Sequence, residues 1–323
     1  MSGAAKLAQS LVAGDRRALS KAITLVESSL ESDRLAAREL LSRLGEPKAT
    51  FRIGVTGVPG AGKSTLIDGL GLAATSAGRR VAVLAVDPSI RQSGGSVLGD
   101  KTRMTQLSAA PSAFVRPSPT RGVLGGTAGR TREVILLCEA AGYDVIFVET
   151  VGVGQSEERV ASMVDCVLLV LLAGAGDELS SMKRGVLEAA DLIAFNKADG
   201  ERAQAVQNEA AALGASLAIS RPGHTPPVLV LSALEGSGVG ELWAALSVQH
   251  AAAEQRGALG RRRLAQRRAW FDAALEEALL AAFGSPELAA AKAAAEHSVE
   301  SGAVAPWEAA HRLVALALSR RRG

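Results

Sequence analysis

A glycine-rich loop near residue 60 is the feature that most restricts the fold of this chain. Residues 51–70 read FRIGVTGVPGAGKSTLIDGL, so the loop lies between two apolar runs. Its inner part, GVPGAGKS at residues 57–64, has the spacing of a phosphate-binding loop, in which backbone N–H groups face phosphates at a helix N-terminus. In this pattern Lys63 neutralises the charges of the β- and γ-phosphates, and Ser64 ligates Mg²⁺. The pattern predicts a strand over residues 51–56 and, after the loop, a helix over residues 63–77.

Further apolar runs follow the loop at regular intervals. They are VAVLAVD (81–87), YDVIFVET (143–150), CVLLVLLAG (166–174), LIAFNKAD (192–199) and PVLVLSAL (227–234). Each run is almost continuously apolar, as expected for strands that are buried on both faces, and a helix-compatible segment separates it from the next. This alternation predicts an α/β fold with a doubly wound, mainly parallel sheet.

The two ends of the chain have helical patterns instead. Over residues 6–44, apolar residues such as Leu19, Ile23, Val26 and Leu30 recur at helical spacing, which predicts two or three helices. Beyond residue 240 we expect a long helical stretch over 241–283, broken near 257–260, and shorter helices over 286–300 and 306–319. We therefore divide the chain into an N-terminal helical segment (1–48), a domain around the phosphate loop (49–248) and a C-terminal helical arm (249–323). The apolar residues of the arm are expected to be buried against a second copy of the chain, so we expect a homodimer.

Composition and charge exclude several classes of protein. The chain has 323 residues, of which 48% are hydrophobic, and its net charge is +3. Arginines cluster at residues 261–268 and 320–322, but without interleaved aromatic residues a solvated helix face is favoured over a nucleic-acid site. Cys138 and Cys166, the two cysteines, lie in apolar runs, which indicates buried thiols in a reducing compartment. The longest apolar run is too short to span a bilayer and no signal-peptide pattern is present, so we expect a cytoplasmic protein without membrane contact.

A second motif identifies the base of the nucleotide. Residues 196–199 read Asn-Lys-Ala-Asp at the end of an apolar run, which is the N-K-x-D pattern of guanine-nucleotide proteins. The carboxylate of Asp199 can accept hydrogen bonds from guanine N1–H and from the exocyclic amine, two donors that adenine does not offer in that arrangement. Residues 232–234, Ser-Ala-Leu, resemble the loop whose backbone N–H contacts guanine O6. Together with the phosphate loop these motifs predict a P-loop GTPase core that binds GTP and GDP.

Three carboxylates are candidates for Mg²⁺ binding and catalysis. Asp87 and Glu149 end predicted strands, and Asp100 lies in the glycine-rich stretch SGGSVLGDKTRM. Carboxylates at the C-terminal ends of parallel strands lie beside the phosphate loop and hold Mg²⁺ or its water molecules. For each of them a helix cap or a surface ion pair remains an alternative. Glu149 stands where small GTPases have the Asp of Asp-x-x-Gly, with Gly152 in place, and Gln155 is either a water-positioning residue or an ordinary loop residue.

The complete predicted site has three overlapping sets of residues. The nucleotide contacts are Gly57, Gly60, Ala61, Gly62, Lys63, Ser64, Thr65, Asn196, Lys197, Asp199, Ser232, Ala233 and Leu234. The metal ligands are Ser64, Asp87, Asp100 and Glu149, and the catalytic residues are Lys63, Asp87, Asp100 and Glu149.

Several longer segments resemble one family of proteins. They are DPSIRQSGGSVLGDKTRM (87–104), RPSPTRGVLGG (116–126), YDVIFVETVGVGQSE (143–157) and AGAGDELSSMKRGVLEAADLIAFNKAD (173–199). With the C-terminal pattern LWAAL…RRRLAQRRAW they resemble the MeaB/ArgK GTPases over nearly the whole chain. The resemblance implies a homodimeric G-protein chaperone that protects or reactivates an adenosylcobalamin-dependent methylmalonyl-CoA-type mutase and gates cofactor delivery from an adenosyltransferase.

The resemblance also assigns roles to positions of this sequence. It implies that Lys63 and Ser64 bind phosphate and Mg²⁺, that the three carboxylates form the metal and switch shell, and that residues 196–199 bind guanine. It further implies a mobile loop at residues 174–183 that communicates with the mutase. Here the chain departs from the family's usual PGAGDELQxxKxG, because Ala173 replaces the proline and Ser180 the glutamine. Ser180 lacks the side-chain amide of that glutamine, and this difference affects how strongly the partner is expected to stimulate GTP hydrolysis.

Three other functions remain alternatives from the sequence. The first is a nucleotide-dependent kinase or ATPase of a lysine/arginine/ornithine transport system, against which the guanine motif argues. The second is a GTPase that inserts a metal such as nickel, which would need clustered soft or imidazole ligands, whereas His224, His250, His297 and His311 are dispersed. The third is an interaction protein that binds GTP without hydrolysing it.

Overall fold

The computed structural model describes residues 2–28, 30–45, 49–86, 104–116, 127–150, 160–174, 184–223, 225–282 and 286–319. The chain divides into two units, residues 1–263 and residues 264–323, which are described separately. Among the described residues, no helix has the length and apolar character needed to cross a bilayer.

A parallel sheet forms the centre of the first unit. Its strands are β1 (Phe51–Gly57), β2 (Val81–Val86), β3 (Ala113–Arg116), β4 (Val145–Thr150), β5 (Cys166–Leu172), β6 (Leu192–Asn196) and β7 (Val228–Val230). Their order across the sheet is β3-β2-β4-β1-β5-β6-β7, and every neighbouring pair is parallel. Parallel strands bring their C-terminal ends to one edge, so the loops after β1, β4, β6 and β7 meet there.

The strands that lie inside the sheet are those whose sequences are mainly apolar. All residues of β1, β4 and β6 are buried, and Phe147 and Phe195 are among the largest side chains with no exposure. The terminal strands β3 and β7 are partly exposed. The mainly parallel α/β sheet predicted from the sequence is confirmed. The seventh strand, β3, was not predicted, because its four residues include a charged one and lie between proline-containing segments.

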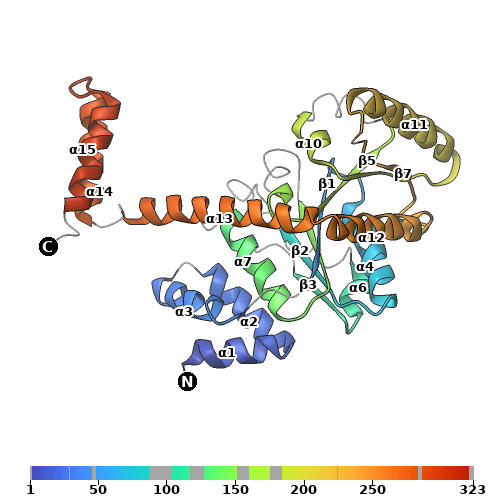
Figure 1. The fold of residues 1–323 in the computed structure, drawn as a ribbon, viewed down its shortest axis with the longest axis horizontal. Helices are drawn as coiled ribbons and strands as arrows, with labels where there is room; N and C mark the ends of the chain where they lie inside the picture. The colour runs from blue at the N-terminus through green and yellow to red at the C-terminus, as the bar shows by residue number, and fades with distance from the viewer. Residues whose placement is uncertain are drawn as a thin grey trace. The chain divides into compact units, whose positions relative to one another are not determined.

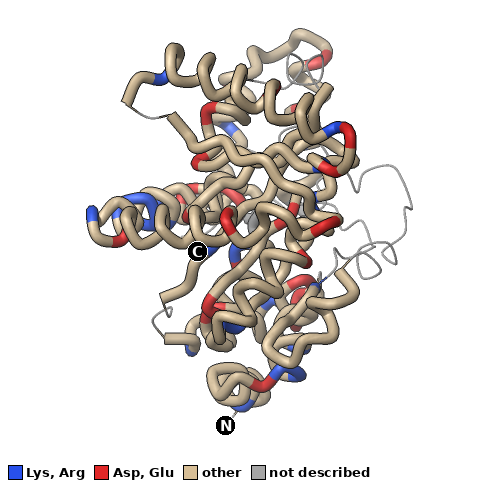
Figure 2. Tube along the Cα trace, turned by 90° about the vertical axis from the view of Figure 1, so that its right-hand side faces the viewer, with Lys and Arg blue, Asp and Glu red and all other residues tan. Residues whose placement is uncertain are grey.

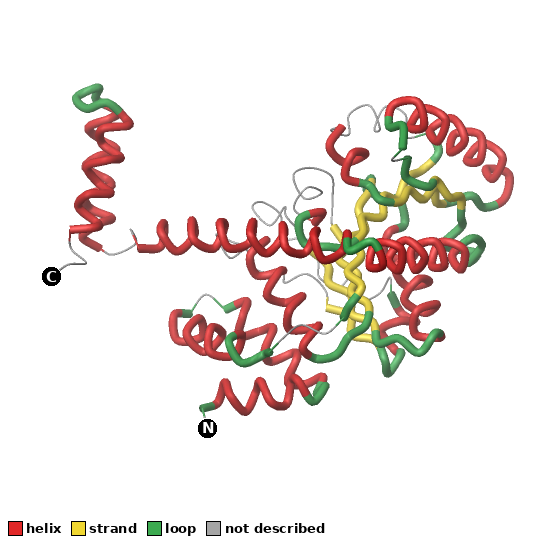
Figure 3. Tube along the Cα trace, in the orientation of Figure 1, coloured by secondary structure: helices red, strands yellow, loops and turns green. Residues whose placement is uncertain are grey.

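Helices cover both faces of the sheet (Figures 1 and 3). On one face lie α4 (Lys63–Ser76), α6 (Thr105–Ala109) and α12 (Val239–Gln255), with α4 in contact with both of the others. The other face carries α7 (Thr127–Ala140). Three helices lie beside strands β5–β7 or connect them: α10 (Arg184–Ala189), the short helix η1 (Gly200–Arg202) and α11 (Ala203–Ser220).

The N-terminal segment forms three helices that pack on one another and against α7. They are α1 (Gly3–Val12), α2 (Arg16–Glu27) and α3 (Glu31–Leu41). The predicted apolar face is confirmed at Leu19, Ile23 and Val26, which are buried. Leu30 is 63% exposed, since it precedes α3 as its N-terminal cap residue and not as part of the helical face.

The second unit contains most of α13 (Ala258–Ala282), together with α14 (Pro286–Glu300) and α15 (Pro306–Ser319), which pack against each other. The predicted break before α13 falls at Gly257, whose φ of 65° is favoured by glycine. Basic and acidic residues are interspersed along the described trace (Figure 2). Of the arginines predicted to form a solvated helix face, Arg261, Arg267 and Arg268 are exposed. The prediction is wrong for Arg262 and Arg263, which are partly buried and pair with Asp191 and Asp165. The three-segment division of the sequence stays a prediction.

Candidate nucleotide site

The phosphate loop joins β1 to α4, as its sequence predicts. Gly57 ends β1 with a φ of 143°, and a Cβ atom there would lie 2.0 Å from the carbonyl oxygen of Val170 in β5. Gly62 precedes α4 with a φ of 83°, and its Cβ would lie 2.6 Å from Nδ2 of Asn196. Only glycine fits either position without moving a neighbouring strand or the base-binding loop.

Lys63 lies at the start of α4 with its ammonium group over the loop. Its Nζ donates to the carbonyl oxygens of Gly57 at 2.8 Å and Val58 at 3.1 Å, and the residue is only 8% exposed. The N-terminal turn of α4 adds N–H groups that point toward the loop and have no acceptor within the helix, together with the positive end of the helix dipole. The loop therefore concentrates positive charge where a phosphate chain would lie, with Gly60 and Ala61 in the loop and Thr65 exposed on the first turn.

Ser64 and Glu149 lie together beside the loop. The hydroxyl of Ser64 donates to Oε1 of Glu149 at 2.7 Å, and both residues are buried. Glu149 is the penultimate residue of β4 and pairs in register with Val55 of β1. A hydroxyl and a carboxylate are the ligand types that Mg²⁺ prefers, so this pair fits the ion. Asp87, Asp100, Gly152 and Gln155 lie outside the described residues.

Asn196 connects the phosphate loop to the base-binding loop. This side chain is 2% exposed, donates from Nδ2 to the carbonyl oxygen of Ala61 at 2.7 Å and accepts at Oδ1 from the N–H of Ala233 at 2.9 Å. Both polar atoms of the amide are thereby used. The sequence predicted Asn196 as a nucleotide contact, and the structure places it as a brace between two loops.

Asp199 is held by Ser232. The hydroxyl of Ser232 donates to Oδ1 of Asp199 at 2.9 Å and accepts from the N–H of Glu235 at 3.2 Å. The other carboxylate oxygen, Oδ2, accepts no hydrogen bond from a described residue. Between the two loops, the N–H of Ala198 donates to the carbonyl oxygen of Leu231 at 3.1 Å. These contacts fix the orientation of the carboxylate that was predicted to bind guanine.

Lys197 and Leu234 are the more exposed members of the predicted set. Lys197 has a φ of 64° and is the one non-glycine residue with a positive φ in the part of the chain that is described. Such a conformation is strained for a side chain with a Cβ, and strain of this kind clusters at ligand sites. Leu234 is 81% exposed, so it lies at the rim of the base-binding loop.

One contact beside the phosphate loop was not predicted from the sequence. Thr150, the last residue of β4, donates from Oγ1 to Oγ1 of Thr56 at 3.1 Å, and both residues are buried. This bond ties the end of β4 to the end of β1 next to Glu149. The adjacent threonines could have been found only from the pairing of β1 with β4, because no motif marks them.

Fold and site together define a P-loop nucleotide-binding protein of the guanine type. The family model described as methylmalonyl Co-A mutase-associated GTPase MeaB matches residues 19–287, and the chain belongs to this family. It is accordingly a GTP hydrolase that binds GTP and GDP.

Individual relatives agree with this assignment. A putative GTPase of Caulobacter vibrioides is 51% identical over 94% of this chain and 95% of its own length. The mitochondrial methylmalonic aciduria type A homolog of Mus musculus is 42% identical over 98% of this chain and 80% of its length. A crystal structure of an LAO/AO transport system kinase is 35% identical, with a TM-score of 0.75 and 98% of both chains covered.

Proposed function

We propose that this GTPase is a chaperone of an adenosylcobalamin-dependent acyl-CoA mutase of the methylmalonyl-CoA type. In this proposal GTP binding and hydrolysis protect or reactivate the mutase. They also gate the loading of its cofactor, which an adenosyltransferase delivers. The observation that carries the proposal is the match to the mutase-associated family over residues 19–287. It is supported by the assembled phosphate, metal and base contacts described above.

We assign the following roles within this proposal. Lys63 binds the phosphates, Ser64 and Glu149 hold Mg²⁺ with Asp87 and Asp100, and Asp199 selects guanine. When bound, Mg²⁺ supplies positive charge to the β- and γ-phosphate oxygens. The protein's own contribution is positioning: Lys63 neutralises phosphate charge, and Asn196 keeps the phosphate loop and the base-binding loop in register.

One helix offers a physical connection between the base site and the segment expected to contact the mutase. Helix α11 follows the base motif after the short helix η1. Its Glu209 accepts at Oε2 from the N–H of Gly174 at 2.7 Å, immediately before residues 175–183. At its other end, Arg221 donates to the carbonyl oxygens of Leu187 at 3.1 Å and Glu188 at 2.8 Å, in the helix that follows that segment. The same helix therefore anchors both flanks of the segment.

The test is reconstitution with methylmalonyl-CoA mutase. With a non-hydrolysable GTP analogue the wild-type chain should retain the mutase in a pull-down, and GTP should slow inactivation of the mutase during turnover. Lys63→Ala should abolish both effects, because the loop loses its phosphate-binding charge. Lys292→Ala, which removes an exposed lysine of α14, should leave both unchanged. Equal protection by wild type and Lys63→Ala, or no nucleotide-dependent retention of the mutase, would refute the proposal.

A transport-system kinase is the second candidate, because the solved structure of an LAO/AO transport system kinase is 35% identical to this chain. It predicts a preference for ATP and a stable phosphorylated acceptor protein, whereas our proposal predicts competition by GDP and not ADP. A metal-inserting GTPase would need clustered ligands, and the described residues contain no group of three or more His, Cys, Asp or Glu suited to a metal ion.

We also propose that the arm forms a homodimer. On α13, Phe271, Leu275 and Leu279 recur every four residues and are 66%, 47% and 54% exposed. Residues at this spacing lie on one side of a helix, so they form an apolar stripe. Such a stripe is stabilised when a second copy covers it.

A further inference from the structure

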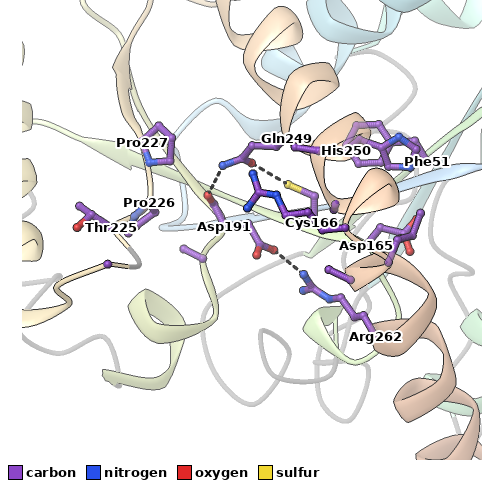
Figure 4. A pocket seen from close by; sticks show the side chains of 17 residues that line it. Phe51, Asp165, Cys166, Asp191, Thr225, Pro226, Pro227, Gln249, His250 and Arg262 are labelled. Carbon is purple, nitrogen blue, oxygen red and sulfur yellow. Dashed lines mark hydrogen bonds and ion pairs between the residues drawn. The ribbon is translucent and has the colours of Figure 1, made fainter.

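A pocket lies at the opposite end of the sheet from the nucleotide site (Figure 4). It encloses about 540 Å³ and is formed where β1, β5, β6 and β7 begin, with α12 and the first turns of α13 as its other wall. Phe51 and Cys166 are the first residues of β1 and β5, and Asp191 and Pro227 immediately precede β6 and β7. The volume is in the range that holds a small organic molecule.

Much of the wall of this pocket is apolar. It includes the ring of Phe51, the prolines Pro226 and Pro227, and small or aliphatic side chains of the helices such as Ala253 and Leu259. Alanines on α12 leave space that larger side chains would fill. The pocket can therefore hold a flat apolar group without rearrangement of the strands.

His250 places a polar atom in this wall. Its ring lies against that of Phe51 with centroids 4.1 Å apart, and its Nε2 is buried without a hydrogen-bond partner among the described residues. Burial lowers the pKa of His250, which favours the neutral imidazole. A buried nitrogen without a partner reduces stability, and a ligand oxygen that accepted a hydrogen bond from it would remove that cost.

The acidic residues of the pocket lining form ion pairs, and one of its basic residues does not. Asp165 accepts from Nε and Nη2 of Arg263 at 2.8 and 2.6 Å, and Asp191 accepts from Nη1 of Arg262 at 3.0 Å. Each carboxylate also accepts a backbone N–H. Arg256, at the end of α12, has no ion pair with any residue that the structure describes. Both acidic residues of the lining are thus paired, whereas Arg256 is the lining residue whose positive charge has no ion pair with a described residue.

We propose that this pocket binds a small organic anion, with its apolar body between the prolines and the alanines of α12 and its acidic group within reach of Arg256 and of Nε2 of His250. The site is distinct from the nucleotide site, because it lies at the N-terminal ends of the strands whose C-terminal ends carry the phosphate and base loops. The proposal does not depend on a mutase partner.

The probe for this site is naphthalene-2-sulfonate, measured by equilibrium dialysis against the full chain with saturating GDP. We expect one site per chain whose affinity is the same without GDP, and weaker binding of the uncharged naphthalene-2-sulfonamide. Displacement of the sulfonate by GDP, or equal binding of the two compounds, would overturn the proposal. Since GTP hydrolysis and mutase protection are measured separately, failure of this site leaves the proposed function untouched.

Substitutions in the pocket wall test whether naphthalene-2-sulfonate binds there. Ala253→Phe should fill the pocket and abolish binding, whereas Ala251→Phe changes an exposed residue of the same helix and should have no effect. Undiminished binding by Ala253→Phe with normal GDP affinity would refute the assignment. If instead Ala253→Phe dissociates a dimer that the wild type forms, the pocket belongs to a subunit interface and the proposal is wrong.

Two further variants keep the test valid if Ala253→Phe does not fold. His250→Phe keeps a ring against Phe51 and removes Nε2, so the affinity should fall about tenfold, as for loss of a hydrogen bond to a charged group. Arg256→Gln should weaken binding about threefold to fivefold, the range of an exposed ion pair. Arg267→Gln removes the same charge from an exposed position on α13 and serves as the control. Wild-type affinity in both His250→Phe and Arg256→Gln would overturn the proposal.

Discussion

Removal of the Asn196 amide is the most direct test of how the two nucleotide-binding loops are held together. Asn196→Ala deletes a donor 2.7 Å from the carbonyl oxygen of Ala61 and an acceptor 2.9 Å from the N–H of Ala233. The side chain is 2% exposed, so neither group gains easy access to water. A buried partner left without its hydrogen bond costs about 1–3 kcal/mol. We therefore expect the free energy of unfolding to fall by about 2–4 kcal/mol.

The loss should be visible in two measurements. Urea unfolding without nucleotide should report the reduced free energy, and the melting temperature should fall by about 4–16 °C, given about 2–4 °C per kcal/mol for a domain of this size. Binding of a fluorescent GDP analogue should weaken at least tenfold, about 1.4 kcal/mol, because the phosphate loop is no longer fixed to the base-binding loop.

Two matched variants separate hydrogen bonding from packing and from general surface effects. Asn196→Asp keeps the volume but replaces the donor facing Ala61 with an oxygen, so it should destabilise the protein at least as much as Asn196→Ala. Asn208→Ala removes an exposed asparagine of α11 and should change stability by less than about 0.5 kcal/mol. If Asn196→Asp kept the stability and the GDP affinity of the wild type, the role of Asn196 in holding the two loops together would be refuted.

The remaining predictions concern the metal, the base, the core and the arm. Ser64→Ala should remove most of the increase in GTP affinity that Mg²⁺ gives, measured by titration with and without the ion. Asp199→Asn should lower GDP affinity about 100-fold and improve binding of xanthosine diphosphate, whose C2 carbonyl can accept from the new amide; unchanged base preference would contradict this role. Glu139→Ala removes the carboxylate that contacts the buried Arg52 at 2.7 and 2.9 Å, and urea unfolding should show a loss of about 3–5 kcal/mol. Leu275→Lys should shift sedimentation toward monomer, and a dimer of unchanged affinity would exclude the stripe as its interface.

The success of the sequence analysis for the sheet has a simple physical reason. Strands buried on both faces must be apolar at consecutive positions, so runs such as CVLLVLL of β5 are visible without a structure. β3 is visible only through its pairing with β2, because a short terminal strand of the sheet buries part of its surface and needs no continuous apolar run. An apolar run in the sequence indicates that a strand is buried, whereas the pairing of one strand with another depends on the arrangement of the whole sheet.

The same distinction applies to the site. Lys63 and Asp199 belong to motifs, and the chemistry of phosphate and guanine explains their residue types directly. The contacts of Asn196 with Ala61 and of Ser232 with Asp199 join segments that are 135 and 33 residues apart. They arise because the sheet order places the ends of β1, β6 and β7 on one edge. No spacing rule within the sequence could have predicted these partners.

The position of the pocket beneath the same strands leads to an expectation about coupling. β5 begins at Cys166 in the pocket wall and ends at Leu172 near the nucleotide edge, and β6 runs in parallel from Leu192 to Asn196. Both strands are packed on both faces, and packed elements change between discrete arrangements and do not deform continuously. An anion that fits the existing pocket requires no new arrangement, so it should leave GDP affinity unchanged. By reciprocity GDP should then leave the anion's affinity unchanged, and a coupling factor above about 5 in either titration would show that the sheet has a second arrangement which both ligands sense.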